Sequence, residues 1–224
     1  EHFLEPLRRA AAPASLRVID TSRGIVTLPM GFAHGHSGHG DHHDRHGAGA
    51  HAANPHIWLD PVRAIQQVET IRDGLIAADP ACEAGYRQRA SAYRVQLLRL
   101  HHELMTELGP FRGRSFIVMH DFAPYFAARY GLMAHDLIET PERRPSPGDV
   151  QRISEIVRRS GIKVLLNQPG EAGGVFDQLA RDLGVRVALF SPLEHLDERQ
   201  LADPLSYLSI MRRNGATLRK AFGG

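Results

Sequence analysis

Apolar and polar positions follow a helical period through the middle of the chain. Asp60 suits a helix N-cap and Pro61 the first helical position, and the apolar residues after them keep helical spacing until Asp79 and Pro80. A second amphipathic pattern covers 80–108. At 1.5 Å per residue, about 30 residues give roughly 40 Å of helix, which is long enough to join two lobes.

Beyond this long helix, short apolar runs alternate with helical patterns. We expect strands at 115–120, 163–169 and 185–190, and helices at 123–131, 145–161, 173–184 and 204–222. This alternation is typical of an α/β lobe with a largely parallel sheet. A β-branched run at 16–28 predicts one more strand that leads into a turn. His101 and His102 lie on the long helix, where we expect them at its surface.

Histidine is concentrated in one short stretch between Phe32 and Trp58. Eight of the fourteen histidines lie there: His34, His36, His39, His42, His43, His46, His51 and His56. Neutral imidazole is a common ligand for zinc, copper and nickel. Glycine, alanine, serine and aspartate separate the histidines, so the stretch predicts a solvated loop that handles a metal ion. A low-complexity insert without a metal role and an expression tag stay open as alternatives.

Composition narrows the class of protein further. The chain has 224 residues, 42% of them hydrophobic, a formal charge of +2 and one cysteine, Cys82. A single cysteine excludes an internal disulfide framework and a cysteine-rich metal site. The basic residues are spread along the chain, so we expect no nucleic-acid partner. No apolar run reaches the roughly 20 residues of a membrane span, and a chain that begins at Glu1 is expected to be a processed or truncated product.

Two histidines stand at positions that suit a ligand. His120 directly follows the apolar run SFIVM, and ligands of open α/β sheets collect beyond the carboxyl ends of strands. His56 lies in NPHIWLDP, where a proline and a large aromatic residue constrain the backbone. A purely structural role for His120, or His56 as the mere end of the histidine tract, is not excluded by spacing alone.

Three blocks of the sequence resemble a known family. NPHIWLDPVRAIQQVETIRDGLIAADP, SFIVMHDFAPYFAARYGL and PSPGDVQRI, in this order, resemble the zinc-type periplasmic solute-binding protein of metal ABC transporters. The resemblance implies an α/β fold with two lobes of mainly parallel sheets, one long linker helix between them and the metal in the inter-lobe cleft. It divides the chain into an amino-terminal lobe at 1–80 without its first strands and with a histidine-rich loop at 33–53, a linker helix at 81–109, and a carboxy-terminal lobe at 110–224.

The resemblance also implies a ligand set. His56 takes the place of the family's second ligand and His120 that of its third, and a histidine at the third position favours zinc. The family's first histidine is expected upstream of Glu1. Ser191 stands where the family often has an aspartate, so Glu194, His195 or water is expected to complete the site.

Other residues receive accessory roles. Glu139 and Glu142 are expected to orient a ligand imidazole, as metal-bound histidines usually require. The tract from His34 to His51 is expected to gather zinc transiently or to gate the cleft.

The leading functional hypothesis is a binding protein that captures Zn²⁺ outside the cytoplasmic membrane and delivers it to an ABC transporter permease. We expect a periplasmic or membrane-associated monomer that catalyses no reaction, with a zinc metallochaperone as a further possible partner. One alternative is a zinc buffer or metallochaperone that uses the histidine-rich loop. The other is a zinc hydrolase with Asp121 or Glu142 as general base, although the chain has no HExxH motif.

Overall fold

The structure is a computed structural model that describes residues 6, 9–10, 16–31, 52–138, 144–170 and 174–223. Its helices are α2 (Pro61–Ala78), α3 (Glu83–Leu108), α4 (Pro124–Tyr130), α5 (Pro147–Ser160), α6 (Val175–Leu183), α7 (Glu198–Ala202) and α8 (Ser206–Gly223). Short 3₁₀ turns are η1 (Ile57–Leu59), η2 (Pro80–Cys82) and η3 (Gly109–Phe111). The strands are β1 (Ser115–His120), β2 (Met133–Ile138), β3 (Val164–Asn167) and β4 (Arg186–Leu189).

The four strands form one sheet in the order β2-β1-β3-β4, and every pairing is parallel. The predicted α/β fold with a parallel sheet is confirmed. The chain runs from β1 outward to β2 and then crosses back to β3, so the strand order reverses between β1 and β3. Ligands of open α/β sheets bind at the carboxyl ends of strands beside such a reversal.

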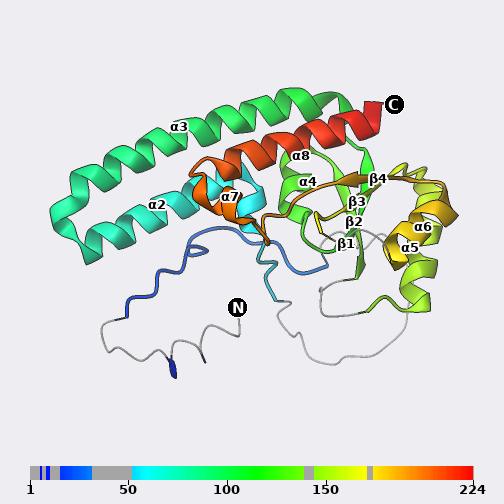
Figure 1. The fold of residues 1–224 in the computed structure, drawn as a ribbon, viewed down its shortest axis with the longest axis horizontal. Helices are drawn as coiled ribbons and strands as arrows, with labels where there is room; N and C mark the ends of the chain where they lie inside the picture. The colour runs from blue at the N-terminus through cyan, green and yellow to red at the C-terminus, as the bar shows by residue number, and fades with distance from the viewer. Residues whose placement is uncertain are drawn as a thin grey trace.

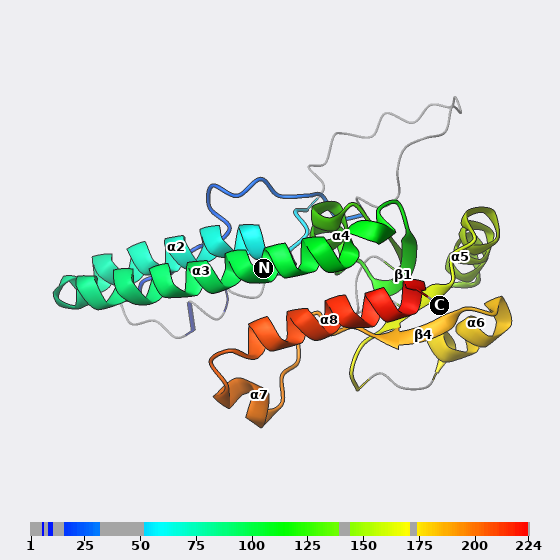
Figure 2. The ribbon, with the colours of Figure 1, turned by 90° about the horizontal axis from the view of Figure 1, so that it is seen from above.

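Helices cover both faces of the sheet (Figures 1 and 2). Phe116, Val118 and Leu166 turn to one face and pack in a core with α3, α4 and α8. Ile117 and Leu165 turn to the other face and pack with α5 and α6. This alternation is the period of a strand with both faces buried.

Helices α2 and α3 form a long antiparallel pair that reaches beyond the sheet (Figure 1). Helix α2 begins as the sequence predicts, because the Asp60 carboxylate accepts a hydrogen bond from the Val62 amide at 2.9 Å. Arg63 and Arg129 pair with the fully buried Asp60 carboxylate. Helix α3 has 26 residues, and its buried positions all lie in its second half, where it meets α4 and α8.

Three expectations differ from the structure. The run 16–28 forms no strand among the residues that the structure describes: polar groups of the run bond to helix α2, and Ile25 packs against Ile57 and Tyr125. Arg17 donates to the Ala77 carbonyl at 2.5 Å, and only Pro29 makes an isolated bridge, to Ala53. The run 133–138 forms β2 although no strand was expected there. His101 is partly buried against the Tyr130 ring, and only His102 is exposed.

Among the described helices, none is both long and apolar enough for a membrane span. The division into two lobes at 1–80 and 110–224 stays a prediction, and the histidine tract from His34 to His51 lies outside the described residues.

Candidate metal centre

His56 is held by the asparagine two residues before it. The Asn54 side-chain oxygen lies 2.9 Å from His56 Nδ1 and also accepts the His56 backbone N–H at 3.0 Å. Asn54 is fully buried, and its amide nitrogen donates to the Asp121 carbonyl at 2.7 Å and to the Asp121 carboxylate at 3.0 Å. These bonds fix the amide, so its oxygen faces His56 and holds a ring proton on Nδ1.

The residues after His56 tie this segment to the rest of the fold. The Trp58 indole N–H donates to the Pro192 carbonyl at 2.8 Å, and the Tyr207 hydroxyl donates to the Trp58 carbonyl at 2.7 Å. His56 is only 5% exposed, and its Nε2 is the nitrogen that points away from Asn54. The segment is therefore anchored both to the loop after β4 and to helix α8.

His120 is the last residue of β1, at the strand reversal described above, and is 2% exposed. Its ring lies 5.6 Å from the His56 ring, centroid to centroid. Its Nδ1 lies 3.1 Å from the side-chain nitrogen of Gln168, the residue that follows β3. The expectation that His120 lies at a carboxyl strand end is confirmed.

Glu194 reaches the two histidines from the loop after β4. Its Oε1 lies 2.7 Å from His56 Nε2 and 3.4 Å from His120 Nε2. Burial opposes ionisation of this carboxyl, but the hydrogen bonds to His120 and His56 outweigh burial and lower its pKa to about 2. The preceding Leu193 has a φ of 65°, the only positive value at a non-glycine residue among those described. This left-handed backbone is uncommon for leucine and occurs at the residue that directs Glu194 into the site.

His56, His120 and Glu194 thus bring together three potential ligand atoms within 4.8 Å of one another. Tetrahedral zinc with bond lengths of about 2.0–2.1 Å separates neighbouring ligand atoms by roughly 3.3 Å. The distance from Glu194 Oε1 to His56 Nε2, 2.7 Å, is shorter than this, the distance to His120 Nε2, 3.4 Å, is close to it, and all three atoms lie within 4.8 Å of one another, so the group fits a zinc ion. Two imidazoles and a carboxylate also match the donor types that zinc prefers.

Asp121 supports His56 indirectly, because it holds the side chain of Asn54. Its Oδ2 accepts hydrogen bonds from the Gly31 amide at 2.8 Å and from Asn54 at 3.0 Å. Burial raises the pKa of this carboxyl despite the hydrogen bonds that it accepts. Its carboxylate connects the segments on both sides of the histidine tract to the end of β1.

The other sequence candidates fall elsewhere. His195 is exposed and is not part of the group of three. Glu139 and Glu142 lie outside the described residues, as does the tract from His34 to His51. Asn54 and Gln168, which contact the two histidines, were not predicted. An amide two residues before a candidate ligand could have indicated Asn54, but nothing in the sequence places Gln168 beside His120.

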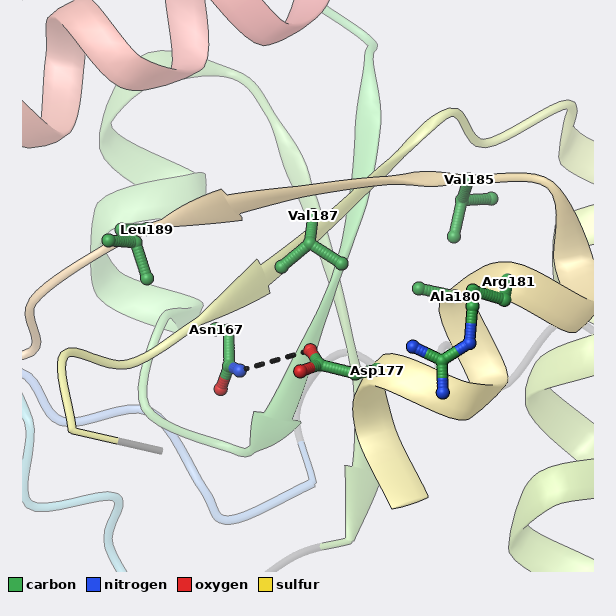
Figure 3. Close-up of a pocket in the computed structure, with 7 residues that line it drawn as sticks. All are labelled: Asn167, Asp177, Ala180, Arg181, Val185, Val187 and Leu189. Carbon is green, nitrogen blue, oxygen red and sulfur yellow. Dashed lines mark hydrogen bonds between the residues drawn. The ribbon is translucent and has the colours of Figure 1, made fainter. Parts of the chain in front are cut away.

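A separate pocket of about 380 Å³ lies between α6 and the edge strand β4 (Figure 3). Its lining residues are Asn167, Asp177, Ala180, Arg181, Val185, Val187 and Leu189. Apolar side chains from β4 form much of its wall, and it contains none of the three potential ligands. We assign no part of the metal chemistry to it.

Fold and site together define the class as an α/β protein with two buried histidines and a carboxylate grouped at a strand reversal. The chain belongs to the ZnuA family, described as the periplasmic component A of the zinc-uptake complex, whose model matches residues 1–221. The predicted membership in the zinc-type solute-binding family is confirmed. This is a family of solute-binding transport proteins and not of enzymes.

Individual relatives agree with this assignment. Zinc-binding protein AdcA of Streptococcus pyogenes is 34% identical over 170 residues, which cover 75% of this chain and 33% of that protein. High-affinity zinc uptake system protein ZnuA of Bacillus subtilis is 26% identical over 166 residues, covering 74% of this chain and 52% of that protein. The crystal structure of the Zn(II)-bound ZnuA-like domain of Streptococcus pneumoniae AdcA has a TM-score of 0.74 at 25% identity and covers 99% of this chain and 76% of that one. The chain thus spans about a third to a half of the length of these two curated relatives.

Proposed function

We propose that this chain binds Zn²⁺ outside the cytoplasmic membrane and delivers it to the permease of an ABC transporter. The observation that carries the proposal is the convergence of His56, His120 and Glu194 within 4.8 Å in a chain of the zinc-uptake family. Two neutral imidazoles and one carboxylate bring a single negative charge to a divalent cation. A fourth coordination position is left for water or another side chain.

The proposed ligands come from three separate segments, and this arrangement suits capture and release. His56 belongs to the segment before α2, His120 to the end of β1 and Glu194 to the loop after β4. Zinc bound by all three would link these segments, so the permease could detect whether the protein is loaded. We further propose that the linker helix joins two lobes and that the protein acts as a monomer.

We propose that the site does not catalyse a reaction. A zinc hydrolase needs a general base within reach of a metal-bound water. The carboxylate of Asp121, one of the two candidate bases, already accepts hydrogen bonds from Gly31 and Asn54, and Asp121 is not part of the group of three. Glutamate is the third potential ligand, which leaves no second described carboxylate in the group. Hydrolysis of an ester or peptide that stops on zinc removal would contradict this proposal.

A metallochaperone or zinc buffer remains the second candidate function, because the histidine tract offers many additional imidazoles. In that case zinc would pass to another protein. For the transport function, we propose a zinc metallochaperone as a further partner. Zinc uptake by cells distinguishes the two, since only the transport function depends on the cognate permease.

The binding step is tested by competition with a chromophoric zinc chelator. We expect one tight site in the wild-type chain, its persistence when 34–51 is deleted, and its loss in His120→Ala. His102→Ala, which removes an exposed histidine of α3, is the matched control and should keep the tight site. A tight site that disappears with 34–51 and is indifferent to His120→Ala would contradict the proposal.

A further inference from the structure

The two histidines of the proposed site are held by side-chain amides of opposite polarity. His56 Nδ1 faces the oxygen of Asn54 at 2.9 Å, whereas His120 Nδ1 faces the nitrogen of Gln168 at 3.1 Å. An amide oxygen only accepts a hydrogen bond, and an amide nitrogen only donates one. The two rings therefore differ at Nδ1, where His56 carries a proton and His120 accepts one, although both present Nε2 to Glu194.

At His56 the arrangement already suits a metal. The Asn54 oxygen requires a proton on His56 Nδ1, so a cation can bind this ring only at Nε2, where it would replace the hydrogen bond to Glu194. Asn54 cannot turn over easily, because its amide nitrogen would lose two hydrogen bonds to Asp121. Its fixed amide thus keeps a proton on His56 Nδ1 and leaves Nε2 as the atom that a metal can reach.

At His120 the arrangement is the reverse. The Gln168 nitrogen donates to Nδ1, so the proton of the neutral ring lies on Nε2 and points to Glu194 Oε1 at 3.4 Å. A protonated Nε2 has no lone pair for a cation. Zinc binding through this atom therefore requires the ring proton to move to Nδ1 and an acceptor to replace the amide nitrogen there.

Gln168 can supply that acceptor by turning its own amide. Within the described part of the chain, no other hydrogen bond holds the Gln168 side chain, in contrast to the two that hold Asn54. A half-turn of the amide would place its oxygen against His120 Nδ1. The proton that leaves Nε2 is matched by one gained at Nδ1, so the ring stays neutral.

We propose that Gln168 is a positioning residue that selects the tautomer of His120, and that its amide turns over when the cation binds. The inference rests on the proposed zinc site. The unloaded site keeps His120 paired with Glu194, and loading exchanges this pair for a metal ligand supported by the Gln168 oxygen. Metal-bound histidines usually donate their second nitrogen in this way, and loss of the supporting partner typically costs about 10- to 100-fold in affinity.

The experiment uses ¹⁵N NMR of the complete chain to determine which ring nitrogen of His120 carries the proton. His120→Ala is used to assign the signals. In metal-free wild type we expect the proton on Nε2, and in the zinc-loaded protein on Nδ1. Gln168→Glu carries only acceptor atoms, so it should move the proton to Nδ1 even without metal. Gln88→Glu, which adds the same charge at an exposed position of α3, should leave the tautomer unchanged.

Zinc affinity provides the second readout. Gln168→Leu should weaken the tight site by about 10- to 100-fold, and Gln168→Glu should restore it to the wild-type level or above. A proton on Nδ1 in the metal-free wild type, or an affinity within twofold of wild type in Gln168→Leu, would overturn the inference. If Gln168→Glu moves the proton but zinc binds nowhere near His120, the proposed function fails while the role of Gln168 stands.

Discussion

At the scale of single residues, the proposed site depends on how each imidazole is oriented before a metal arrives. His56 and Glu194 are 2.7 Å apart and largely shielded from water. The position of His56 is fixed by Asn54, which is itself held by Asp121. A preorganised pair of ligands loses little conformational freedom on binding, which favours tight capture.

Asn54→Ala tests this orientation. The substitution removes the acceptor that the described residues offer to His56 Nδ1, so we expect zinc affinity to fall by about 10- to 100-fold while the chain stays folded. Chelator competition gives the affinity, and circular dichroism confirms the fold. A folded variant with wild-type affinity would show that the bond between Asn54 and His56 has no part in binding.

His101 provides a pH-dependent prediction away from the site. Burial lowers the pKa of His101 below 6.5, and the nearby charge of Arg129 lowers it further. The unfolded chain therefore binds this proton more readily, and the folded state loses stability as pH falls through about 6.5. In urea unfolding at pH 7.5, 6.5 and 5.5 with zinc chelated, His101→Gln should lose stability less steeply than wild type.

The matched control is the neighbouring, exposed His102. The variant His102→Gln should follow the wild-type dependence on pH. Equal slopes for wild type and His101→Gln would mean that burial of His101 does not affect its protonation.

Local signals singled out His56 and His120, a proline-fixed turn for one and the end of an apolar strand for the other, and the family resemblance then made them the expected ligands. The sequence offered Glu194 only together with its neighbour His195 as a candidate ligand. The left-handed backbone at Leu193 decides which of the two side chains enters the site. The contact between Gln168 and His120 could not be predicted. It depends on β3 pairing with β1, and this pairing joins residues that lie 48 positions apart.

At the scale of secondary-structure elements, most boundaries follow from local chemistry. Helix α5 begins with a capping box in which Ser146 and Asp149 exchange hydrogen bonds between side chain and backbone. Strand β2 was missed because it begins with the exposed Met133 and carries the polar His135 and Asp136, so it lacks a continuous apolar run. Its pairing with β1 is what stabilises it. The run 16–28 was assigned to a strand because β-branched residues favour one, but no strand of the described sheet lies next to it.

Ser146→Ala should destabilise the fold by about 1 kcal/mol, because the amide at position 149 loses its side-chain partner. Urea unfolding of the metal-free chain measures the change. Ser160→Ala, at the other end of α5, is the control and should leave stability nearly unchanged. An equal loss in both variants would indicate that the cap itself contributes nothing.

The contact between α3 and α8 gives a second prediction at this scale. A methyl group added at Gly215 of α8 would collide with the buried side chain of Leu104, whereas one added at Gly85 of α3 would meet only the flexible end of Arg89. Gly215→Ala should therefore destabilise the chain by about 1–3 kcal/mol, less the helix-propensity gain of about 1 kcal/mol.

Gly85→Ala is the counterpart and should stabilise the chain by up to about 1 kcal/mol, because alanine is the better helix former. Chemical denaturation of both variants gives the comparison. If Gly215→Ala proved as stabilising as Gly85→Ala, the close approach of α8 to Leu104 would be refuted.

At the scale of the whole molecule, the three proposed ligands belong to segments that meet only when the sheet is assembled. The unfolded chain cannot hold them together, so zinc at the site binds the folded state in preference. With free zinc at about 100 times Kd, we expect the free energy of unfolding to rise by about 2.7 kcal/mol. Thermal or urea unfolding measures the change, and His120→Ala should abolish most of it. A gain that survives His120→Ala but disappears on deletion of 34–51 would place the stabilising zinc on the tract.

Acid should weaken capture by the whole molecule. Protons compete with zinc for imidazole nitrogens, whose ordinary pKa is about 6.5, whereas the pKa of Glu194 is lowered to about 2 and this carboxylate stays charged. Zinc affinity measured from pH 7.5 to 5 should therefore fall steeply below about pH 6. A flat profile over this range would contradict binding through histidine.

The overall architecture was predictable because the alternation of elements dictates a parallel sheet with helices on both faces. The position of the site at the reversal between β1 and β3 could not be predicted, because strand order is set by the packing of the whole domain.

The most direct test of the central claim is a crystal structure of the zinc-loaded chain with anomalous diffraction recorded on both sides of the zinc absorption edge. The account predicts one dominant zinc peak within about 2.0–2.1 Å of the Nε2 atoms of His56 and His120, with Glu194 as the third ligand. A dominant peak elsewhere, with Glu194 still lying between the two histidines, would contradict it.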